Sequence, residues 1–466
     1  MNRILILGGG LSGYYIARGL EGKLRGGEAE VTLVDMRSAC VYQPFLAEVA
    51  SGAIEPRHIE TPFAMHLRRT RLVRAKVTGI DTAARRVEVV DAHGNASTLE
   101  YDTLVVALGG VTRTFPIPGI AENAVGLKAT EEAVYLRDNL IHNLGCAAGL
   151  PKGSPERARL MTLVCVGGGF SGMEGFAELY DLARRICRRD PRLDASELGF
   201  HLIEATEKVF PELDARQSGR AVAHLERLGA HVHLKTCVES AEGGLVRTSD
   251  GASYDASLIL WCAGTMANPV LKSTDLPLEP RGRVVCGADL RVRRDGEVLE
   301  GVFAVGDCAC VPDLTGHGLP DGSCAPTAQH SMRQSKVLLR NLLAYLRAGE
   351  TTGTGKASGA AGTTAGTPEM AEYRHENAGM VAGLGAGYGA FTSGALTKGG
   401  TKIRFNGWLA WMAHRMYHGL ALPSWERKFR VWGDWTAGLV FRRDLGDVIE
   451  TRNPRGFFEE FATRSK

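Results

Sequence analysis

Two apolar runs, each leading into a glycine-rich turn, are the strongest pattern along this chain. The runs cover residues 4–7 and 163–166, and sequence compatible with a helix follows each turn. The turn glycines are Gly8, Gly10, Gly13, Gly167, Gly169 and Gly172. Each segment therefore predicts a buried strand, a G-x-G-x-x-G turn and a helix. Backbone N–H groups at such a turn, together with the helix N-terminus, bind a pyrophosphate. The repeat predicts two dinucleotide sites in one chain.

Each repeat continues into a second apolar strand that ends in an acid. Residues 31–35 end at Asp35, and residues 200–204 end at Glu204. A carboxylate at this position accepts hydrogen bonds from a ribose. Glu204 would also repel the 2′-phosphate of NADPH, so the sequence favours NADH for the second site. Because the insertion before the second strand is longer than usual, a solvated acid at Glu204 is the alternative.

Three further apolar runs are predicted to complete the two nucleotide units. Residues 101–109 and 258–264 each end in a glycine turn, and residues 301–307 end in Gly-Asp. Asp307 would lie at a strand tip beside a helix N-terminus, where its carboxylate can accept from sugar hydroxyls. A plain helix cap is the alternative for this residue. The predicted fold class is α/β, with two Rossmann-like dinucleotide-binding domains.

Composition narrows the class of protein further. The net charge of +3 gives no reason to expect nucleic acid as a partner. Ten cysteines without a C-x-x-C pair fit a reducing compartment and argue against a disulfide reductase, and no metal site is expected. The N-terminal apolar run ends at once in the glycine turn, so it is predicted to be the first strand and not a signal peptide.

The composition changes beyond about residue 349. Residues 349–367 form a Gly/Ala/Thr/Ser tract that is predicted to be flexible. Residues 378–397 carry no charge and have the length of a membrane helix, but their many glycines favour a hairpin instead. Five of the six tryptophans follow, interleaved with Arg and Lys.

The tail is predicted to contain a basic amphipathic helix. Helical spacing puts one apolar set on a common face: Trp425, Phe429, Trp432, Trp435 and Leu439. The charged residues that would point elsewhere are Glu426, Arg427, Lys428 and Arg430. Such a helix lies in a membrane interface, with its cations near anionic lipid. Packing on the protein's own core or on a second copy of the chain is the alternative.

Together these motifs resemble the type II NADH:quinone oxidoreductases of the two-dinucleotide flavoprotein superfamily. The resemblance covers nearly the whole chain. Besides the repeated turn, it rests on residues 42–46, 301–307, 326–330, 408–411 and 441–444. It implies a glutathione-reductase-like flavoprotein fold with a C-terminal membrane-surface segment. It also implies FAD and NADH as cofactors and a quinone as the acceptor.

The resemblance implies a role for individual cofactor-binding residues. Gly8, Gly10 and Gly13 would cradle the FAD pyrophosphate, with Asp35 on the adenosine ribose and Asp307 on the ribityl chain. Gly167, Gly169, Gly172 and Glu204 would hold NADH in the same way. Further cofactor contacts are implied for Gln43, Pro44, Ala107, Gly109, Gly306, Ala328, Ala263 and Gly264.

The same resemblance implies where the reacting groups lie. Glu174 would stand between nicotinamide and flavin and relay protons to the quinone side, with Glu178 one turn later. An acid that only favours the helix dipole is the alternative for Glu174. The residues implied at the quinone side are Gln329, His330 and Arg333. Arg333 stands where the family usually has a glutamine, and Gln334 follows it, so the quinone contacts are expected to differ here.

The predicted domains are residues 1–115 with 280–348 for FAD, 116–279 for NADH, 349–370 as a flexible linker, and 371–466 as a hairpin and membrane-anchoring region. The predicted activity passes hydride from NADH to flavin, then two electrons to a quinone, at the cytoplasmic face of the cell membrane and without proton pumping. A homodimer is left open. The alternatives are a sulfide:quinone oxidoreductase, which needs a cysteine pair beside the flavin, a soluble reductase of an aromatic or quinone metabolite, and a non-catalytic NADH-sensing flavoprotein.

Overall fold

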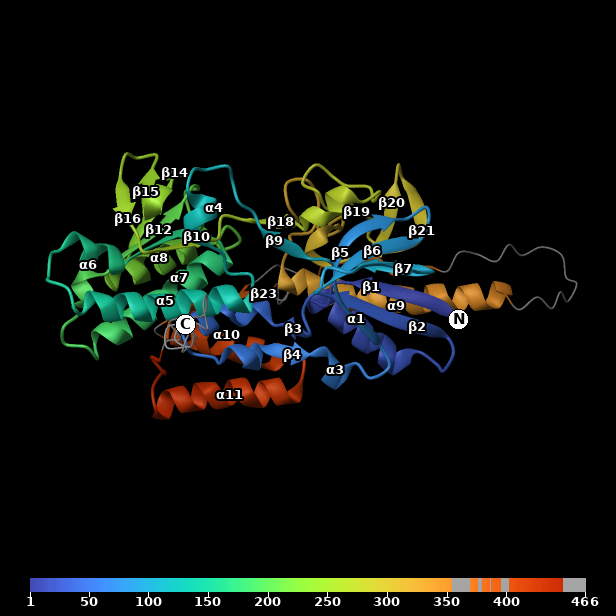
Figure 1. The fold of residues 1–466 in the computed structure, drawn as a ribbon, viewed down its shortest axis with the longest axis horizontal. Helices are drawn as coiled ribbons and strands as arrows, with labels where there is room; N and C mark the ends of the chain where they lie inside the picture. The colour runs from blue at the N-terminus through green and yellow to red at the C-terminus, as the bar shows by residue number, and fades with distance from the viewer. Residues whose placement is uncertain (354–368, 376–378, 386, 395–401, 447–466) are drawn as a thin grey trace, which may run out of the picture. The chain divides into compact units, whose positions relative to one another are not determined.

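The computed structural model describes residues 1–353, 369–375, 379–385, 387–394 and 402–446 (Figure 1). Contacts along the backbone divide the chain into two compact units. Unit 1 comprises Met1–Tyr42, Glu60–Val111 and Thr265–Asn377, and unit 2 comprises Gln43–Ile59, Thr112–Gly264 and Ala378–Lys466. Residues 43–59 and 265–279 thus fall in other units than the domain boundaries from sequence suggest. The assignment of the units to FAD and NADH stays a prediction, as does the linker at 349–370, most of which lies outside the described residues.

Unit 1 is built on an eight-stranded sheet with the strand order β20-β21-β8-β1-β2-β5-β6-β7. The strands are β1 (Asn2–Leu7), β2 (Ala29–Asp35), β5 (Arg71–Asp81), β6 (Arg86–Asp91), β7 (Ala96–Glu100), β8 (Thr103–Val106), β20 (Arg291–Arg294) and β21 (Glu297–Ala304). The five strands from β21 to β5 run parallel, and the pairs at both edges are antiparallel. The central strands β1 and β8 are buried apolar runs, as expected for a parallel sheet covered on both faces.

Two long helices of unit 1, α1 (Leu11–Lys23) and α9 (Ala328–Gly353), lie side by side (Figure 1). Their backbones approach closely at Gly19, where an added Cβ would come within 2.3 Å of the Leu339 side chain. The shorter elements of this unit are β3 (Ala39–Val41), β4 (Glu60–Pro62), α3 (Phe63–His66), β9 (Gly110–Thr112, which ends in unit 2), β18 (Thr265–Ala267), η5 (Pro269–Ser273), β19 (Val284–Val285), η6 (Gly306–Cys308) and β22 (Ala309–Cys310).

Unit 2 repeats the plan with a five-stranded parallel sheet of order β10-β17-β11-β12-β13. These strands are β10 (Ala124–Val125), β11 (Thr162–Val166), β12 (Gly199–Glu204), β13 (His231–Leu234) and β17 (Leu258–Trp261). A three-stranded antiparallel sheet adds β14 (Val238–Ser240), β15 (Leu245–Thr248) and β16 (Ser253–Asp255). The second strand-turn-helix repeat predicted from sequence is therefore confirmed.

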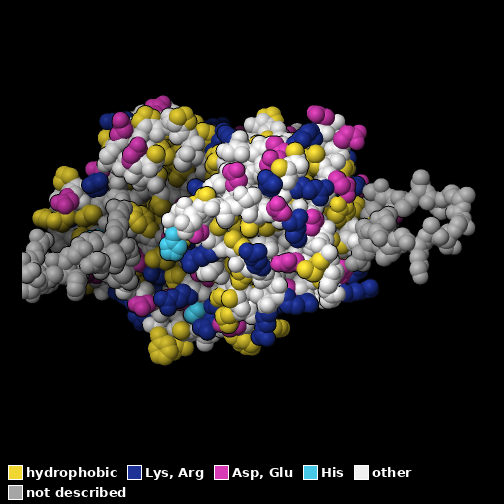
Figure 2. Space-filling view, turned by 45° about the vertical axis from the view of Figure 1, so that its right-hand side comes forward, with side chains coloured by type: hydrophobic (Ala, Val, Ile, Leu, Met, Phe, Trp, Pro, Cys, Tyr) yellow, Lys and Arg dark blue, Asp and Glu magenta, His cyan; other side chains and the backbone are white. Residues whose placement is uncertain are grey.

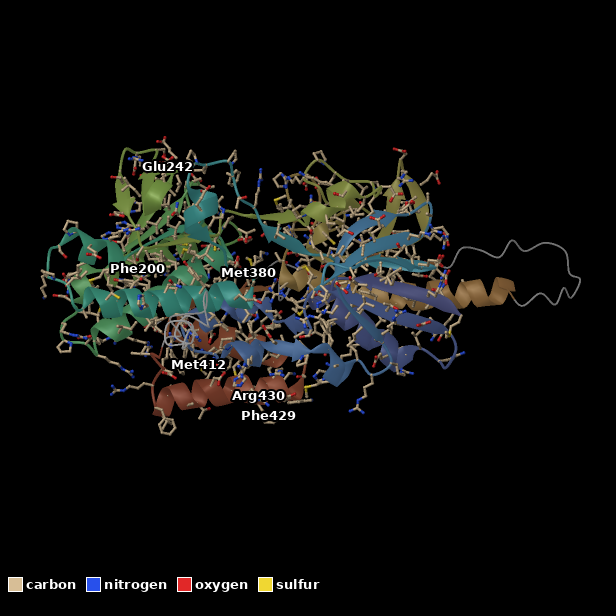
Figure 3. The ribbon with its side chains drawn as sticks, viewed as in Figure 1. Phe200, Glu242, Met380, Met412, Phe429 and Arg430 are labelled. Carbon is tan, nitrogen blue, oxygen red and sulfur yellow. The ribbon has the colours of Figure 1, made fainter. Side chains whose placement is uncertain are left out.

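The helices of unit 2 pack around this sheet. They are α2 (Leu46–Ala50), α4 (Ile120–Asn123), α5 (Thr130–Ala147), α6 (Pro155–Leu160), α7 (Phe170–Cys187) and α8 (Ala215–Arg227), with 3-10 turns η1 (Gln43–Phe45), η2 (Pro56–Ile59), η3 (Ala195–Glu197) and η4 (Glu242–Gly244). The α7 helix is buried nearly all round, and Phe176 and Tyr180 on it pack against Phe200 of β12, labelled in Figure 3. This aromatic cluster fixes α7 on the sheet.

The C-terminal part of unit 2 is a small sheet followed by two helices. Its strands are β23 (Gly379–Gly383), β24 (Gly389–Ser393) and β25 (Arg404–Gly407), and its helices are α10 (Trp408–Ala421) and α11 (Trp425–Val440). β23 and β24 pair antiparallel, with Val381 opposite Phe391. The hairpin predicted for this glycine-rich stretch is confirmed over the residues that the structure describes. Across those same residues, no helix has both the length and the apolar character that crossing a membrane requires.

The amphipathic character predicted for α11 is only partly right. Trp425, Phe429 and Leu439 are 67%, 65% and 80% exposed, as a surface stripe requires. Trp435 instead turns inward, because its Nε1 donates to Glu48 Oε2 at 2.8 Å. Arg427, expected to point away from the apolar face, is buried, and its guanidinium donates to the Arg57 carbonyl. The helix therefore packs on unit 2 along one side and exposes apolar side chains on another.

Candidate functional site

The first glycine turn forms a tight cradle in unit 1. Gly8 has φ +98°, and a Cβ there would lie 2.3 Å from the Ala107 carbonyl oxygen. A Cβ on Gly13 would lie 1.8 Å from the Gly8 oxygen. At Gly10, by contrast, a Cβ would meet nothing within 4 Å. Two glycines are thus required by the protein's own packing, while the third keeps the backbone open on the ligand side, as a pyrophosphate requires.

The second turn reproduces this geometry in unit 2. Gly167 has φ +107°, and a Cβ there would lie 2.5 Å from the Cys262 oxygen. A Cβ on Gly172 would come within 1.9 Å of the Gly167 oxygen, and one on Gly169 would meet nothing within 4 Å. Gly169 is also the N-cap of α7, as Gly10 is of α1. Each unit therefore presents an open glycine at a helix N-terminus.

The acids at the ends of β2 and β12 are held in matching ways. Asp35 accepts from the Gly9 N–H at 2.6 Å and from the Arg37 N–H at 2.7 Å. Glu204 accepts from Gly168 at 2.6 Å and from Thr206 at 2.7 Å. Both carboxylates are thus fixed beside the middle glycine of their turn, where a ribose next to the pyrophosphate would lie. Burial raises the pKa of Asp35, and the two backbone N–H groups oppose that shift.

Asp307 lies in η6, directly after β21, as the sequence predicts. Ser331 Oγ donates to Asp307 Oδ1 at 3.3 Å, and Ser12 Oγ donates to the Ser331 carbonyl at 3.3 Å. The Gly306 N–H donates to Gln334 Oε1 at 2.9 Å. The start of α9 is therefore tied both to η6 and to α1. Gln334 is a residue whose role the sequence did not reveal, because its neighbour Arg333 occupies the position expected for a glutamine.

The predicted quinone-side residues begin α9. His330 Nδ1 lies 2.9 Å from the hydroxyl of Tyr373, which is also 3.1 Å from His375 Nδ1. The two imidazole rings stack at 4.0 Å. Burial, followed by the nearby His375, lowers the pKa of His330 to about 4, so this ring is neutral at pH 7. Gln329 and Arg333 are half-buried on the same turns.

The other predicted cofactor residues follow the cradles along the chain. Ala107 and Gly109 end β8, and Ala328 begins α9, all in unit 1. Ala263 and Gly264 follow β17 in unit 2, where the Arg113 N–H donates to the Gly264 carbonyl. Gln43 and Pro44 also belong to unit 2, and Gln43 Nε2 donates to the Lys128 carbonyl at 3.1 Å. A flavin contact of these two residues stays a prediction.

Glu174 lies on the second turn of α7 and is not an isolated helix acid. Its Oε1 accepts from the Gly383 N–H at 3.0 Å and lies 3.4 Å from His414 Nε2. The partners come from β23 and α10, more than 200 residues later in the chain. Sequence reasoning did not single out His414 or Glu48. The available signal for Glu48 was an acid within the apolar run of residues 45–50.

The cysteines offer no support for sulfur chemistry. All ten are free thiols, and the ones in unit 1 are mostly buried. Burial raises the pKa of Cys308 to about 11 and that of Cys324 to about 12, so both are protonated at pH 7. Among the residues that the structure describes, no group of His, Cys, Asp and Glu side chains is arranged to hold a metal.

The residues present fit two dinucleotides. Each cradle combines an open glycine, a helix N-terminus and a fixed acid, the set that a pyrophosphate and its ribose need. In unit 1, Asp307 adds a carboxylate beside the same helix start, where sugar hydroxyls of a flavin chain can donate. Unit 2 lacks a printed counterpart of that arrangement among its described residues, consistent with a nicotinamide nucleotide there.

Comparison with known proteins agrees with this geometry. The chain is 27% identical to the internal alternative NAD(P)H-ubiquinone oxidoreductase A1 of Arabidopsis thaliana mitochondria, over 96% of this chain and 86% of that protein. It is also 27% identical to a type II NADH:quinone oxidoreductase of Mycobacterium tuberculosis, over 95% and 89% of the two chains. The solved structure of NDH2 from Plasmodium falciparum in complex with NADH superposes with a TM-score of 0.81 at 17% identity, covering 96% of this chain and all of that one.

The family model for pyridine nucleotide-disulphide oxidoreductases matches residues 2–333, which include both glycine cradles, both ribose acids and the start of α9. The two-unit α/β flavoprotein fold expected from sequence is confirmed by this match and by the solved neighbour. The chain belongs to the pyridine nucleotide-disulphide oxidoreductase family.

Proposed function

We propose that this protein is an NADH:quinone oxidoreductase that carries FAD and works at a membrane surface. The observation that carries the proposal is the pair of matching cradles, one in each unit. Curated relatives that match nearly the full chain are named NAD(P)H:quinone or NADH:quinone oxidoreductases. FAD, when bound, accepts a hydride from NADH and gives two electrons to an acceptor.

The chain's own residues bind and orient the two nucleotides in this proposal. Gly10 and Gly169 admit the pyrophosphates, and Asp35 and Glu204 accept from the riboses. Asp307 accepts from the ribityl chain. His330, held neutral by burial, is suited to hydrogen-bond a quinone oxygen without adding charge to the site. The four raised or buried thiols of unit 1 do not supply the reactive sulfur pair that a sulfide:quinone oxidoreductase needs.

Support for the membrane surface comes from the C-terminal helices. The apolar residues that are at least 50% exposed there are Ile403, Trp408, Leu409, Met416, Leu420, Trp425, Phe429, Leu439, Val440 and Phe441. A soluble surface rarely gathers so many large apolar side chains. Figure 2 shows hydrophobic side chains projecting along the lower edge, with Lys and Arg among them, and Figure 3 labels Phe429 on α11. Cations beside such a stripe favour anionic lipid. We infer a peripheral position on the cytoplasmic face.

The experiment that tests this function measures both the cofactor and the acceptor. Denatured protein is expected to release FAD, and the folded protein is expected to oxidise NADH when a quinone is present. Sulfide in place of NADH is expected to give no quinone reduction. Release of FMN or of no flavin from folded protein, or sulfide oxidation at a rate like that with NADH, would contradict the proposal.

Glu204→Gln is expected to narrow the preference for NADH over NADPH. In the wild type, the Glu204 carboxylate would face the 2′-phosphate of NADPH, and this repulsion is worth on the order of 1–3 kcal/mol, or about 5–150-fold in affinity. The amide of the variant carries no charge, yet it can still accept from Gly168 and Thr206. The ratio of kcat/KM for the two nucleotides is the measurement, and equal wild-type values would reduce Glu204 to a solvated acid.

A further inference from the structure

A buried cluster of acids and bases surrounds Glu174 in unit 2. Its acids are Glu48 on α2 and Glu174, Glu178 and Asp181 on α7. Its guanidinium groups are Arg185 on α7, Arg415 on α10 and Arg443, which follows α11. His414 lies among them with 3% of its surface exposed. Such a concentration of charge in a protein interior is costly unless every charge is compensated.

The ion pairs divide this cluster into two parts. Arg443 lies 3.2 Å from Glu178 and 3.4 Å from Asp181, and Arg185 is 2.8 Å from Asp181. Ser51 Oγ also donates to Glu178 at 2.6 Å. These groups satisfy one another. The other part consists of Glu48, Glu174, His414 and Arg415, where Arg415 lies 3.3 Å from Glu48.

His414 bridges the two acids of this second part. Its Nε2 is 3.4 Å from Glu174 Oε1, and its Nδ1 is 3.8 Å from Glu48 Oε1. Neither ring nitrogen makes a hydrogen bond of good geometry with the described residues. A doubly protonated ring has one N–H for each acid, whereas a neutral ring would leave one carboxylate facing a lone pair.

The charges around His414 favour its protonated form. Burial alone lowers the pKa of His414, but Glu174, Glu48 and Glu178 outweigh burial and raise it. Four carboxylates face three guanidinium groups in the cluster, so an imidazolium restores the balance. His418, one turn later on α10, has its ring 4.7 Å away, and burial pushes its pKa well below the usual value, so it stays neutral.

Quinone reduction by NADH needs one proton from solution. The balanced reaction is NADH + H⁺ + quinone → NAD⁺ + quinol, since NADH itself supplies the hydride. Glu174 is the member of the His414 part with the most exposed side chain, at 14%, against 4% for both Glu48 and His414. A quinone that reached the site would cover this opening, so the proton has to be stored before the quinone arrives.

We propose that His414 stores this proton and delivers it to the reduced quinone through Glu174. The His414 imidazolium loses its Nε2 proton to the Glu174 carboxylate, and the Glu174 carboxyl then protonates a quinone oxygen. His414 regains a proton through Glu174 after quinol leaves. His414 acts through Glu174 and is therefore a positioning residue. This inference rests on the proposed quinone reductase function and adds the source of its proton.

His414→Gln tests the inference in the FAD-loaded, full-length enzyme. At pH 7 we expect reduction of a water-soluble short-chain quinone to slow at least about tenfold, the lower end of the effect of losing an acid–base group. Reduction of ferricyanide by NADH, which needs no proton at the acceptor, is expected to stay within about twofold of the wild type. His418→Gln is the matched control, since it removes a buried, neutral imidazole from the next turn of α10.

The pH dependence gives a second readout. An imidazolium is present below its pKa and lost above it, so the wild-type quinone step should fall as pH rises through the raised pKa of His414. This fall should be absent in His414→Gln. Glu48→Gln removes one facing carboxylate while keeping an acceptor for Trp435, and it should move the fall to lower pH by about one unit.

Histidine NMR tests the storage site without turnover. In wild-type enzyme labelled with ¹³C at histidine Cε1, one signal should titrate with a midpoint above 6.5, disappear in His414→Gln and persist in His418→Gln. The inference is overturned if no such signal exists, or if His414→Gln reduces quinone with the wild-type rate and pH profile. Equal slowing with quinone and ferricyanide would also overturn it. If His414→Gln fails to retain FAD, the Glu48→Gln shift decides. A wild-type enzyme that reduces ferricyanide but no quinone would instead refute the proposed function.

Discussion

Gly169→Ala is expected to lower kcat/KM for NADH by about two orders of magnitude while the protein keeps its fold and its FAD. The open position at Gly169 is the reason: an added Cβ meets nothing within 4 Å, and the residue has φ −70°, which alanine adopts freely. The methyl group would therefore occupy only the space into which the NADH pyrophosphate comes. A displacement of about 1 Å at a reacting pair can cost 10²-fold in rate.

The control for this variant is Gly219→Ala, in the middle of α8, where a Cβ also meets nothing within 4 Å. It should leave NADH kinetics unchanged and stabilise the helix by up to about 1 kcal/mol. Gly172→Ala is expected to behave differently again, because its Cβ would press on the Gly167 carbonyl and distort the turn itself. Stopped-flow reduction of the flavin over a range of NADH concentrations separates these cases. Wild-type kinetics in Gly169→Ala would remove the pyrophosphate from this turn.

Replacing Trp425 and Phe429 together with serine is expected to release the protein from lipid vesicles. Both side chains are about two-thirds exposed, and burying each in a membrane interface contributes roughly 1.5–3 kcal/mol. The double variant should therefore bind vesicles about 10²–10⁴-fold more weakly. Co-sedimentation with vesicles of phosphatidylcholine and phosphatidylglycerol measures this. The control is Met65→Ser on α3 of unit 1, which removes an exposed apolar side chain outside the C-terminal helices.

Point substitutions test the membrane surface better than removing the whole tail. A chain ending before Lys402 would lose Trp435 and Arg415 from Glu48 and Arg443 from Glu178, leaving buried carboxylates without partners. Such a loss costs several kcal/mol at each site. The double serine variant leaves these contacts in place. Unchanged vesicle binding by this variant, with FAD retained, would contradict the membrane role of α11.

The local pattern was sufficient to predict the two nucleotide-binding units. The apolar run, the glycine turn and the acid at the next strand end lie within one βαβ segment, so Gly8 and Asp35 could be assigned from spacing alone. The same holds for Gly167, and Glu204 was found in spite of the longer insertion. The glycine-rich hairpin was also predictable, because so many glycines exclude a stable helix.

The buried cluster could not be predicted, because its members are far apart in sequence. Glu48 and His414 are separated by more than 360 residues, and no periodicity connects them. The inward position of Trp435 was missed for a related reason. Helical spacing shows which side chains share a face, but it does not show that Glu48 offers an acceptor beneath one of them. Gln334 was set aside because its register was judged from a pattern rather than from Gly306, its partner.

An anaerobic double-mixing experiment tests the central claim most directly. Purified enzyme is first mixed with a stoichiometric amount of NADH, and flavin absorbance near 450 nm is followed; the reduced enzyme is then mixed with a quinone or with buffer. The account predicts loss of the flavin band with NADH and its recovery only when quinone is added, with one quinol formed for each NADH consumed. Flavin that NADH does not reduce, or reduced flavin that no quinone reoxidises, would contradict it.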